Sequence, residues 1–174
     1  LIANVMRFAE LGEQNLIFLK DKNSTRETAA YCAEHSKLPA ADVAIDELAH
    51  LEDTSSKCQL VECLKKGVAF HNADMNIEER EVVERHFRAG AIRVLCSTST
   101  LAMGVNLPAR NVFLDTQKWH TNKRFNRPYN APITKAEFEN MAGRAGRLSL
   151  ETEFGRAIVV AASEFEYASN THRY

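Results

Sequence analysis

Residues 138–147 read FENMAGRAGR and contain two arginines, each directly after a glycine. Just before them, Thr134 and Glu137 have the spacing of a capping box, which predicts a short helix ending near residue 141. Glycine lets a backbone approach a ligand closely, and an arginine guanidinium is a permanently charged fork that fits phosphate oxygens. Two such arginines could hold a polyphosphate. The alternative is a glycine-terminated helix whose arginines form ordinary surface ion pairs.

Outside this stretch, short apolar runs alternate with helical patterns. Strands are expected at residues 15–20, 68–70, 92–96, 111–115 and 156–161, and helices at 1–11, 24–35, 77–89 and, in one or two pieces, within 39–66. This alternation predicts an α/β fold built on a parallel sheet. Ligands of such folds bind beyond the carboxyl ends of the strands, so His71, the loop from Ser97 and Arg144 are expected on or near that edge.

Capping-box spacing also predicts where other helices begin. The pairs are Ser24 with Glu27, Asn76 with Glu79, and Ser163 with Glu166. Residues 46–50, DELAH, resemble the acidic box of nucleotide-hydrolysing motors, but the histidine comes one residue late and no strand precedes them. We interpret this segment as a solvated helix face.

The composition excludes some classes of protein. The chain has 174 residues, 45% of them hydrophobic, a formal net charge of -1 and a pI of about 6.7, so any basic surface must be local. Its apolar runs are far too short to span a bilayer, and it shows no secretory pattern and no initiator methionine. We therefore expect an intracellular piece, cytoplasmic or nuclear, of a larger protein. The four cysteines lack paired C-x-x-C spacing, so no structural metal is predicted.

Residues 97–109, STSTLAMGVNLPA, closely resemble motif V of superfamily 2 helicases, in the Ski-like DExH branch. Three further segments resemble motifs of the same branch: FENMAGRAGR is similar to motif VI, GVAFHNAD at residues 67–74 to the family's GVAFHHAG segment, and NLIFLKDK at residues 15–22 to motif IV. Their order and spacing resemble the second RecA-like domain, over nearly all of residues 14–162. The resemblance implies a RecA-like parallel β-sheet sandwiched by helices, in one domain over residues 1–174 with residues 1–13 as a linker helix.

This resemblance implies roles for residues on the nucleotide side. The ligand would be ATP with Mg²⁺, bound mainly by the first RecA-like domain, which becomes a partner across a cleft. Arg144 and Arg147 match the motif VI arginines, which offset charge on the transferring phosphoryl group. The other implied ATP-binding positions are Gly104, Asn106, Asn140 and Gly143.

It also implies contacts to a DNA or RNA strand. Thr98 and Thr100 match hydroxyl positions that touch the nucleic-acid backbone, where small polar groups bind without reading sequence. Lys22 and His71 occupy strand-contact positions of the family pattern.

Residues 117–131, QKWHTNKRFNRPYNA, form a local basic stretch. The cations Lys118, Lys123, Arg124 and Arg127 are interleaved with the aromatic residues Trp119, Phe125 and Tyr129, a composition that suits single strands. In related DNA helicases a β-hairpin at this place separates strands, so we expect an inserted loop or β-hairpin that binds nucleic acid. The alternative is a solvated loop whose aromatic residues attach it to the domain.

Two functions remain open. The first is the second motor domain of an ATP-dependent helicase or translocase, inactive alone because the sequence contains neither a P-loop nor a DExH box. The second is a non-catalytic cassette that serves as a scaffold for protein or nucleic-acid partners. It is motivated by Asn140 in place of the family's glutamine, and by Asn72 and Asp74 in place of the second histidine and the glycine of HHAG. A stand-alone nucleotide-binding domain is disfavoured, because no phosphate cradle is present.

Overall fold

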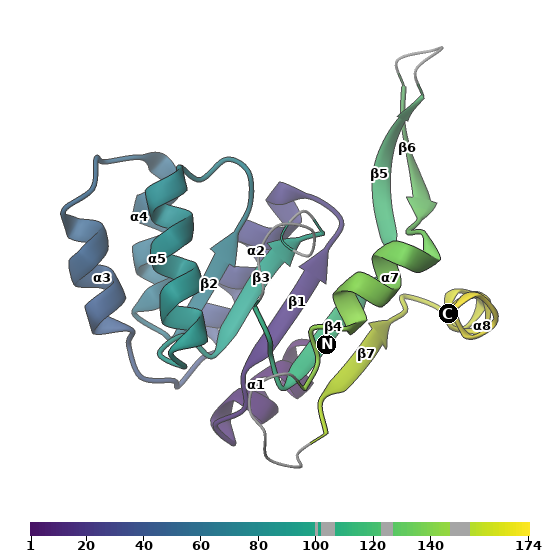
Figure 1. Cartoon of the computed structure of the whole chain (residues 1–174), viewed down its shortest axis with the longest axis horizontal. Helices are drawn as coiled ribbons and strands as arrows, with labels where there is room; N and C mark the ends of the chain where they lie inside the picture. The colour runs from purple at the N-terminus through teal and green to yellow at the C-terminus, as the bar shows by residue number, and fades with distance from the viewer. Residues whose placement is uncertain (100, 102–106, 123–126, 147–153) are drawn as a thin grey trace.

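A five-stranded parallel sheet forms the centre of the computed structural model, which describes residues 1–99, 101, 107–122, 127–146 and 154–174. The strands, in their order across the sheet, are β2 (Val68–His71), β3 (Val94–Thr98), β1 (Asn15–Leu19), β4 (Asn111–Asp115) and β7 (Arg156–Val160). Figure 1 shows them running side by side with helices on both faces. The predicted α/β parallel fold is confirmed.

The middle strands are apolar because both of their faces are covered. In β1 the side chains of Leu16, Ile17 and Phe18 are at most 1% exposed. Ile17 pairs in register with Cys96 of β3 and Phe113 of β4, so one row of the sheet forms a continuous hydrophobic core. β7 lies at the edge and is largely exposed.

Helices cover this sheet from both sides. They are α1 (Ile2–Glu10), α2 (Lys22–Glu34), α3 (Asp42–Ala49), α4 (Ser55–Leu64), α5 (Ile77–Arg88), α7 (Lys135–Ala142) and α8 (Glu164–Arg173). In Figure 1, α2 and α4 lie behind the sheet and α5 and α7 in front of it. None of the helices within the described ranges is long and apolar enough to cross a membrane.

Several predicted helix starts are confirmed. Asn76 and Glu79 form a reciprocal capping box at α5, and Thr134 and Glu137 form another at α7. At α8 the hydroxyl of Ser163 accepts from a backbone amide of the first turn. The helical segment expected in one or two pieces within residues 39–66 forms two helices, α3 and α4.

The predicted start of α2 is wrong by two residues. Its N-cap is Asp21, whose carboxylate accepts a hydrogen bond of 2.7 Å from the amide of Ser24. Asp21 lies two residues after the end of β1 and has extended backbone angles, so its carboxylate caps the helix before Ser24 can do so. Ser24 therefore lies inside the first turn.

The third strand is also displaced, from the predicted residues 92–96 to Val94–Thr98. Its limits are set by its partners, because Val94 pairs with Val68 of β2 and Thr98 with Leu19 of β1. Ile92 is fully buried, but it lies in the turn before the strand. Apolar character alone could not separate these two environments.

A β-hairpin occupies residues 117–132, between β4 and α7. Strands β5 (Gln117–Asn122) and β6 (Arg127–Pro132) pair antiparallel and form a separate two-stranded sheet. Figure 1 shows this hairpin projecting away from the central sheet. The segment therefore takes the hairpin form of the two that the sequence allowed.

Candidate functional site

A groove of about 840 Å³ lies at the carboxyl ends of β1, β2 and β3. Its lining residues are Lys20, Asp21, Lys22, Asn23, Ser24, Glu27, Ala73, Asp74, Thr98, Ser99, Lys118 and Trp119. Three residues that the sequence predicted to bind nucleic acid, Lys22, Thr98 and Lys118, therefore line one groove. They come from α2, β3 and β5, which only the fold brings together.

Asp21 organises one wall of the groove. Besides capping α2, its carboxylate accepts a hydrogen bond from the indole of Trp119. Burial raises the pKa of Asp21, but the hydrogen bonds from Ser24 and Trp119 and the nearby Lys20 outweigh it and hold the pKa below its ordinary value. Asp21 is thus a fixed anion that joins the helix to the hairpin.

Asp74 also lines the groove and pairs with two cations near it. Its carboxylate pairs with Lys22 and, at 3.2 Å, with Nη2 of Arg26. The hydrogen bond from Lys22 lowers the pKa of Asp74. Asn72 shapes this loop, because its side-chain oxygen accepts from the amide of Asp74 at 3.0 Å and its NH₂ donates to Thr25 at 2.9 Å. The two departures from the HHAG segment therefore place an acid against Lys22.

His71 is not among the residues that line the groove. It is 6% exposed, and its Nε2 lies 2.9 Å from the carboxylate of Glu84 on α5. Burial lowers the pKa of His71 by more than Glu84 raises it, so the imidazole is held neutral. The predicted strand contact of His71 stays a prediction, and its packing indicates a role in joining β2 to α5.

An ion pair joins the hairpin to α7. Lys118 pairs with Glu137, which also closes the capping box with Thr134. Burial raises the pKa of Glu137, but the bonds from Lys118 and Thr134 lower it further. Arg127 lies exposed on β6. The predicted contacts Thr100, Lys123 and Arg124 lie outside the described residues.

Arg144 lies at the other edge of the sheet, and the prediction that placed it near the carboxyl edge is wrong. Its carbonyl oxygen accepts a 3.0 Å bond from the amide of Ala109, two residues before β4 begins. The reason is the crossover from β4 to β7: since both strands are parallel, α7 must carry the chain back to their amino ends. Five residues of β4 separate the two edges by about 15 Å.

The glycines of FENMAGRAGR have different environments. Gly143 ends α7 with an ordinary φ of -63°, whereas Gly146 has a φ of +79°. A Cβ on Gly146 would lie 2.7 Å from the amide nitrogen of Gly155, so its freedom serves close packing of two backbone segments. Asn140 is exposed on α7, one turn before Arg144. The predicted residues Gly104, Asn106 and Arg147 lie outside the described ranges.

Sequence reasoning missed part of the groove. It did not identify the roles of Asp21, Trp119 and Asp74 in holding one another and the lysines in place. An aspartate directly after a buried strand is a capping signal that could have revealed Asp21. The pairing of Asp74 with Lys22 joins residues 52 positions apart in the sequence, so it could not be predicted from local sequence patterns.

Other features carry less chemistry. A second hollow of about 480 Å³ lies between α2 and α4 and contains no predicted site residue. Cys32, Cys63 and Cys96 are buried thiols, and burial raises the pKa of Cys63 to about 12. Within the described part of the chain, no three His, Cys, Asp or Glu side chains are arranged to hold a metal ion.

Comparison with known proteins gives the family. Residues 2–149 match the family described as "Helicase conserved C-terminal domain". The chain is 37% identical over 175 residues to the ATP-dependent DNA helicase Hel308 of Methanocella arvoryzae, covering 95% of this chain and 23% of that protein. It is 47% identical over 103 residues to Hel308 of Aeropyrum pernix, covering 59% and 13%, respectively.

A eukaryotic protein is also similar. The chain is 41% identical over 108 residues to the ATP-dependent DNA helicase MER3 of Saccharomyces cerevisiae, covering 62% of this chain and 8% of MER3. It thus spans less than a quarter of the length of these three curated relatives. The family match, by contrast, extends over most of the chain. It includes every strand from β1 to β6 and helix α7, and it ends before β7. This chain belongs to the helicase conserved C-terminal domain family.

Proposed function

We propose that this chain is the second motor domain of an ATP-dependent DNA helicase or translocase of the Ski-like branch. The observation that carries the proposal is the division of the predicted residues between two edges of one sheet. Lys22, Thr98 and Lys118 line a groove at the carboxyl edge, whereas Arg144 lies at the amino edge. This arrangement provides separate binding surfaces for a nucleic-acid strand and for a nucleotide.

The amino edge is the proposed nucleotide side. Arg144 and Arg147 supply positive charge to the phosphates of ATP, which a first RecA-like domain holds across a cleft. The further proposed ATP-binding residues are Asn140, Gly143, Gly104 and Asn106. The described part of this side offers the cation of Arg144 and the exposed amide of Asn140, both of which suit contacts to phosphate oxygens. In the proposal Mg²⁺ is held by the first domain, where it would neutralise phosphate charge.

The chemistry of this side is charge compensation. As the bond to the terminal phosphoryl group breaks, negative charge grows on the phosphate oxygens. An arginine fork offsets that charge more strongly in the transition state than in bound ATP, and this difference lowers the barrier. An arginine in this role is worth about 10³ to 10⁵ in rate.

The groove is the proposed strand side, and DNA is the proposed track because the relatives above are named DNA helicases. Lys22 and the hydroxyl of Thr98 suit contacts to a sugar-phosphate backbone, which carry no sequence information. The hairpin of β5 and β6 projects beside the groove and is the proposed strand-separating element. The assignment of residues 1–174 to one domain, with residues 1–13 as a linker helix, stays a prediction.

The test is nucleic-acid-stimulated ATPase activity of the full-length protein, with single-stranded DNA and RNA in parallel. Arg144→Ala is compared with Arg7→Ala, which removes an exposed arginine from α1. We expect Arg144→Ala to lower stimulated turnover by about 10³-fold or more while DNA binding is retained, and Arg7→Ala to leave both unchanged. Unchanged turnover in Arg144→Ala would contradict the proposal. Binding without turnover in the wild type would favour the non-catalytic scaffold.

A further inference from the structure

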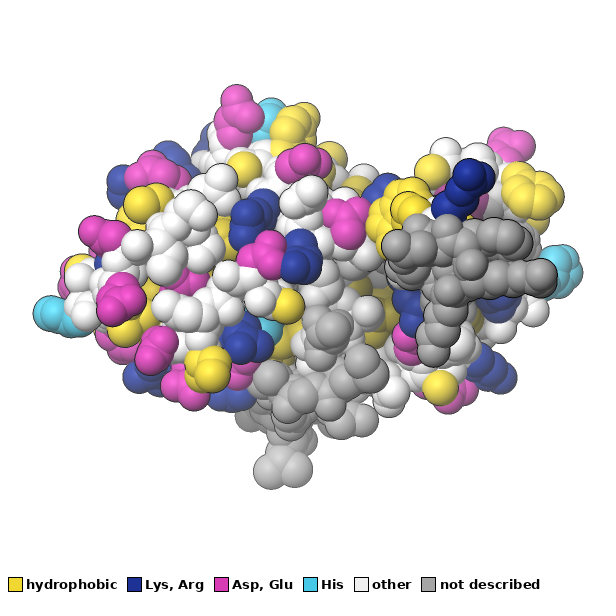
Figure 2. Space-filling view, turned by 90° about the horizontal axis from the view of Figure 1, so that it is seen from above, with side chains coloured by type: hydrophobic (Ala, Val, Ile, Leu, Met, Phe, Trp, Pro, Cys, Tyr) yellow, Lys and Arg dark blue, Asp and Glu magenta, His cyan; other side chains and the backbone are white. Residues whose placement is uncertain are grey.

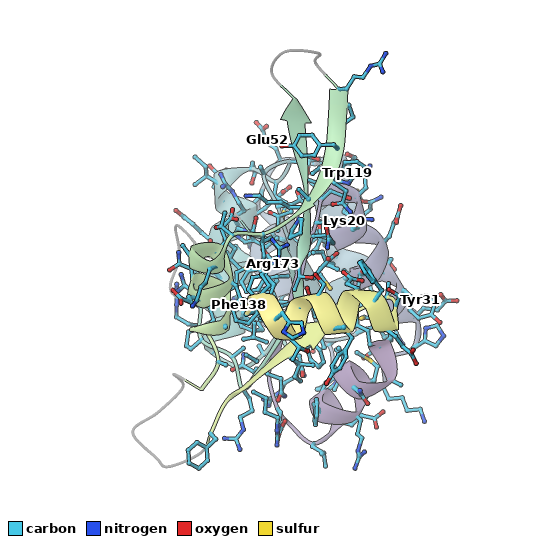
Figure 3. All side chains as sticks on the ribbon, turned by 90° about the vertical axis from the view of Figure 1, so that its right-hand side faces the viewer. Lys20, Tyr31, Glu52, Trp119, Phe138 and Arg173 are labelled. Atoms are coloured by element: carbon cyan, nitrogen blue, oxygen red, sulfur yellow. The ribbon has the colours of Figure 1, made fainter. Side chains whose placement is uncertain are left out.

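Trp119 is the single tryptophan of the chain, and it lines the groove at the carboxyl edge. Its side chain is 49% exposed, a large fraction for a residue type that is highly buried on average. Figure 3 shows Trp119 beside Lys20, which follows β1. Part of the indole surface is therefore open to the groove and is available to a ligand.

The indole is held in place from one side. Its N–H donates to the carboxylate of Asp21, the N-cap of α2, and this contact joins the hairpin to the start of that helix. The hairpin register adds a second constraint, because Trp119 pairs with Asn130 and Tyr129 pairs with the neighbouring position 120. Neighbouring residues of a strand face opposite sides, so Trp119 faces the groove side and Tyr129 the other. The groove is therefore lined by the indole of Trp119, which the hairpin register and the contact with Asp21 hold on this side.

Charge alone does not make this groove attractive to phosphate. Its three lysines, Lys20, Lys22 and Lys118, are matched by the three acids Asp21, Glu27 and Asp74. Lys22 and Lys118 already have ion-pair partners. Figure 2 shows basic and acidic side chains interspersed over this end of the molecule. A ligand of the groove therefore needs a further source of binding energy, and stacking on an aromatic face supplies it.

We propose that the groove is a nucleobase-stacking subsite, in which the indole face of Trp119 packs on one unpaired base. The backbone on either side of that base meets Lys22 and Thr98. The volume of about 840 Å³ lies within the range of about 300–1,000 Å³ that is usual for ligand sites. An unpaired base is required, because the faces of paired bases are covered by their neighbours in a duplex. This inference rests on the proposed function and names the state of the strand that the domain binds.

The single tryptophan makes the test direct. Fluorescence of Trp119 is followed while the chain is titrated with a single-stranded DNA oligonucleotide, a duplex of equal length, and an abasic oligonucleotide with the same number of phosphates. Stacking quenches indole emission, so we expect quenching by the single strand and little by the duplex or the abasic strand. Equal quenching by the abasic strand would overturn the proposal.

Affinities of variants provide the second readout, by fluorescence anisotropy of a labelled single strand. Trp119→Ala should weaken binding by about 5- to 150-fold, and Trp119→Phe by less, because a smaller aromatic face remains. Tyr31→Ala is the matched control, since Tyr31 is 51% exposed on α2 and does not line the groove. Trp119→Phe also keeps the test valid if Trp119→Ala disturbs the hairpin.

The outcomes separate the two proposals. If the single strand binds but Trp119→Ala, Trp119→Phe and Tyr31→Ala all retain parental affinity, the stacking subsite is wrong while the proposed function stands. If the parental chain binds no single strand even at low salt, where phosphate contacts are strongest, the groove is not a strand site and the stacking subsite is wrong, while the ATPase test of the full-length protein still decides the proposed function.

Discussion

The backbone amide of Ala109 donates a hydrogen bond of 3.0 Å to the carbonyl oxygen of Arg144. The amide of Gly146 returns a 2.9 Å bond to the carbonyl of Ala109, so the two segments form a short parallel bridge. Ala109 is fully buried and lies two residues before β4 begins. The bridge therefore fixes the backbone of Arg144 at the amino end of β4, the edge that we propose faces the nucleotide.

Gly146→Ala should destabilise the domain by about 3 kcal/mol. The left-handed φ of +79° strains an alanine, and its Cβ would clash with the backbone of Gly155 at 2.7 Å. Gly12→Ala separates the two causes, because Gly12 has a φ of +83° but no atom within 4 Å of a Cβ. We expect about 1–2 kcal/mol there, measured by denaturant unfolding. Equal losses in the two variants would show that the packing against Gly155 contributes nothing.

Glu79→Ala should cost about 3 kcal/mol, more than the same change in the other capping box. Glu79 is fully buried and accepts hydrogen bonds from Thr54, from Ser56 at 2.9 Å and from the amide of Asn76. Its loss leaves these three donors without their acceptor. Glu137→Ala removes an equivalent but partly exposed carboxylate and should cost about 1 kcal/mol. Chemical denaturation of both variants checks the difference. A larger loss in Glu137→Ala would contradict the role of burial.

His71 should make the stability of the domain fall in acid. Its pKa in the folded state is lowered by burial, which outweighs Glu84, so the unfolded chain binds a proton first as the pH falls. The stabilisation is complete above the ordinary value of 6.5 and is lost as the pH falls toward the folded pKa. His71→Gln should flatten the slope below about pH 6.5, by at most about 1.4 kcal/mol per pH unit. Identical slopes in denaturant series would refute this.

Asp74→Asn should tighten binding of single-stranded DNA if the proposed function holds. The change releases Lys22 and Arg26 from their shared carboxylate and makes them available to phosphates. We expect a several-fold lower Kd at about 50 mM salt and a smaller gain at about 200 mM, because ions screen the added attraction. Asp53→Asn is the control, since it removes the same charge from a residue outside the groove. Equal effects of both variants would assign the gain to net charge.

Much of the architecture could be predicted from local sequence. The alternation of apolar runs with capped helical segments identified all five strands of the sheet and the starts of α5, α7 and α8. These features are local, because a capping box involves only four consecutive residues and a buried strand is recognised from about five consecutive apolar residues. Prediction failed where partners decide the limits: β3 extends to Thr98 because Leu19 pairs with it, and α2 begins at the cap that Asp21 provides.

The sequence by itself determined the motifs and therefore the family, since FENMAGRAGR and STSTLAMGVNLPA are contiguous patterns that need no fold to be recognised. Only the tertiary structure decided which of their residues share a surface. The return of α7 along the sheet put Arg144 at the amino edge, and a pairing across 52 residues put Asp74 against Lys22. The reason is that handedness and chain crossover set the edge on which a residue lies, whereas its sequence neighbours set only its local backbone.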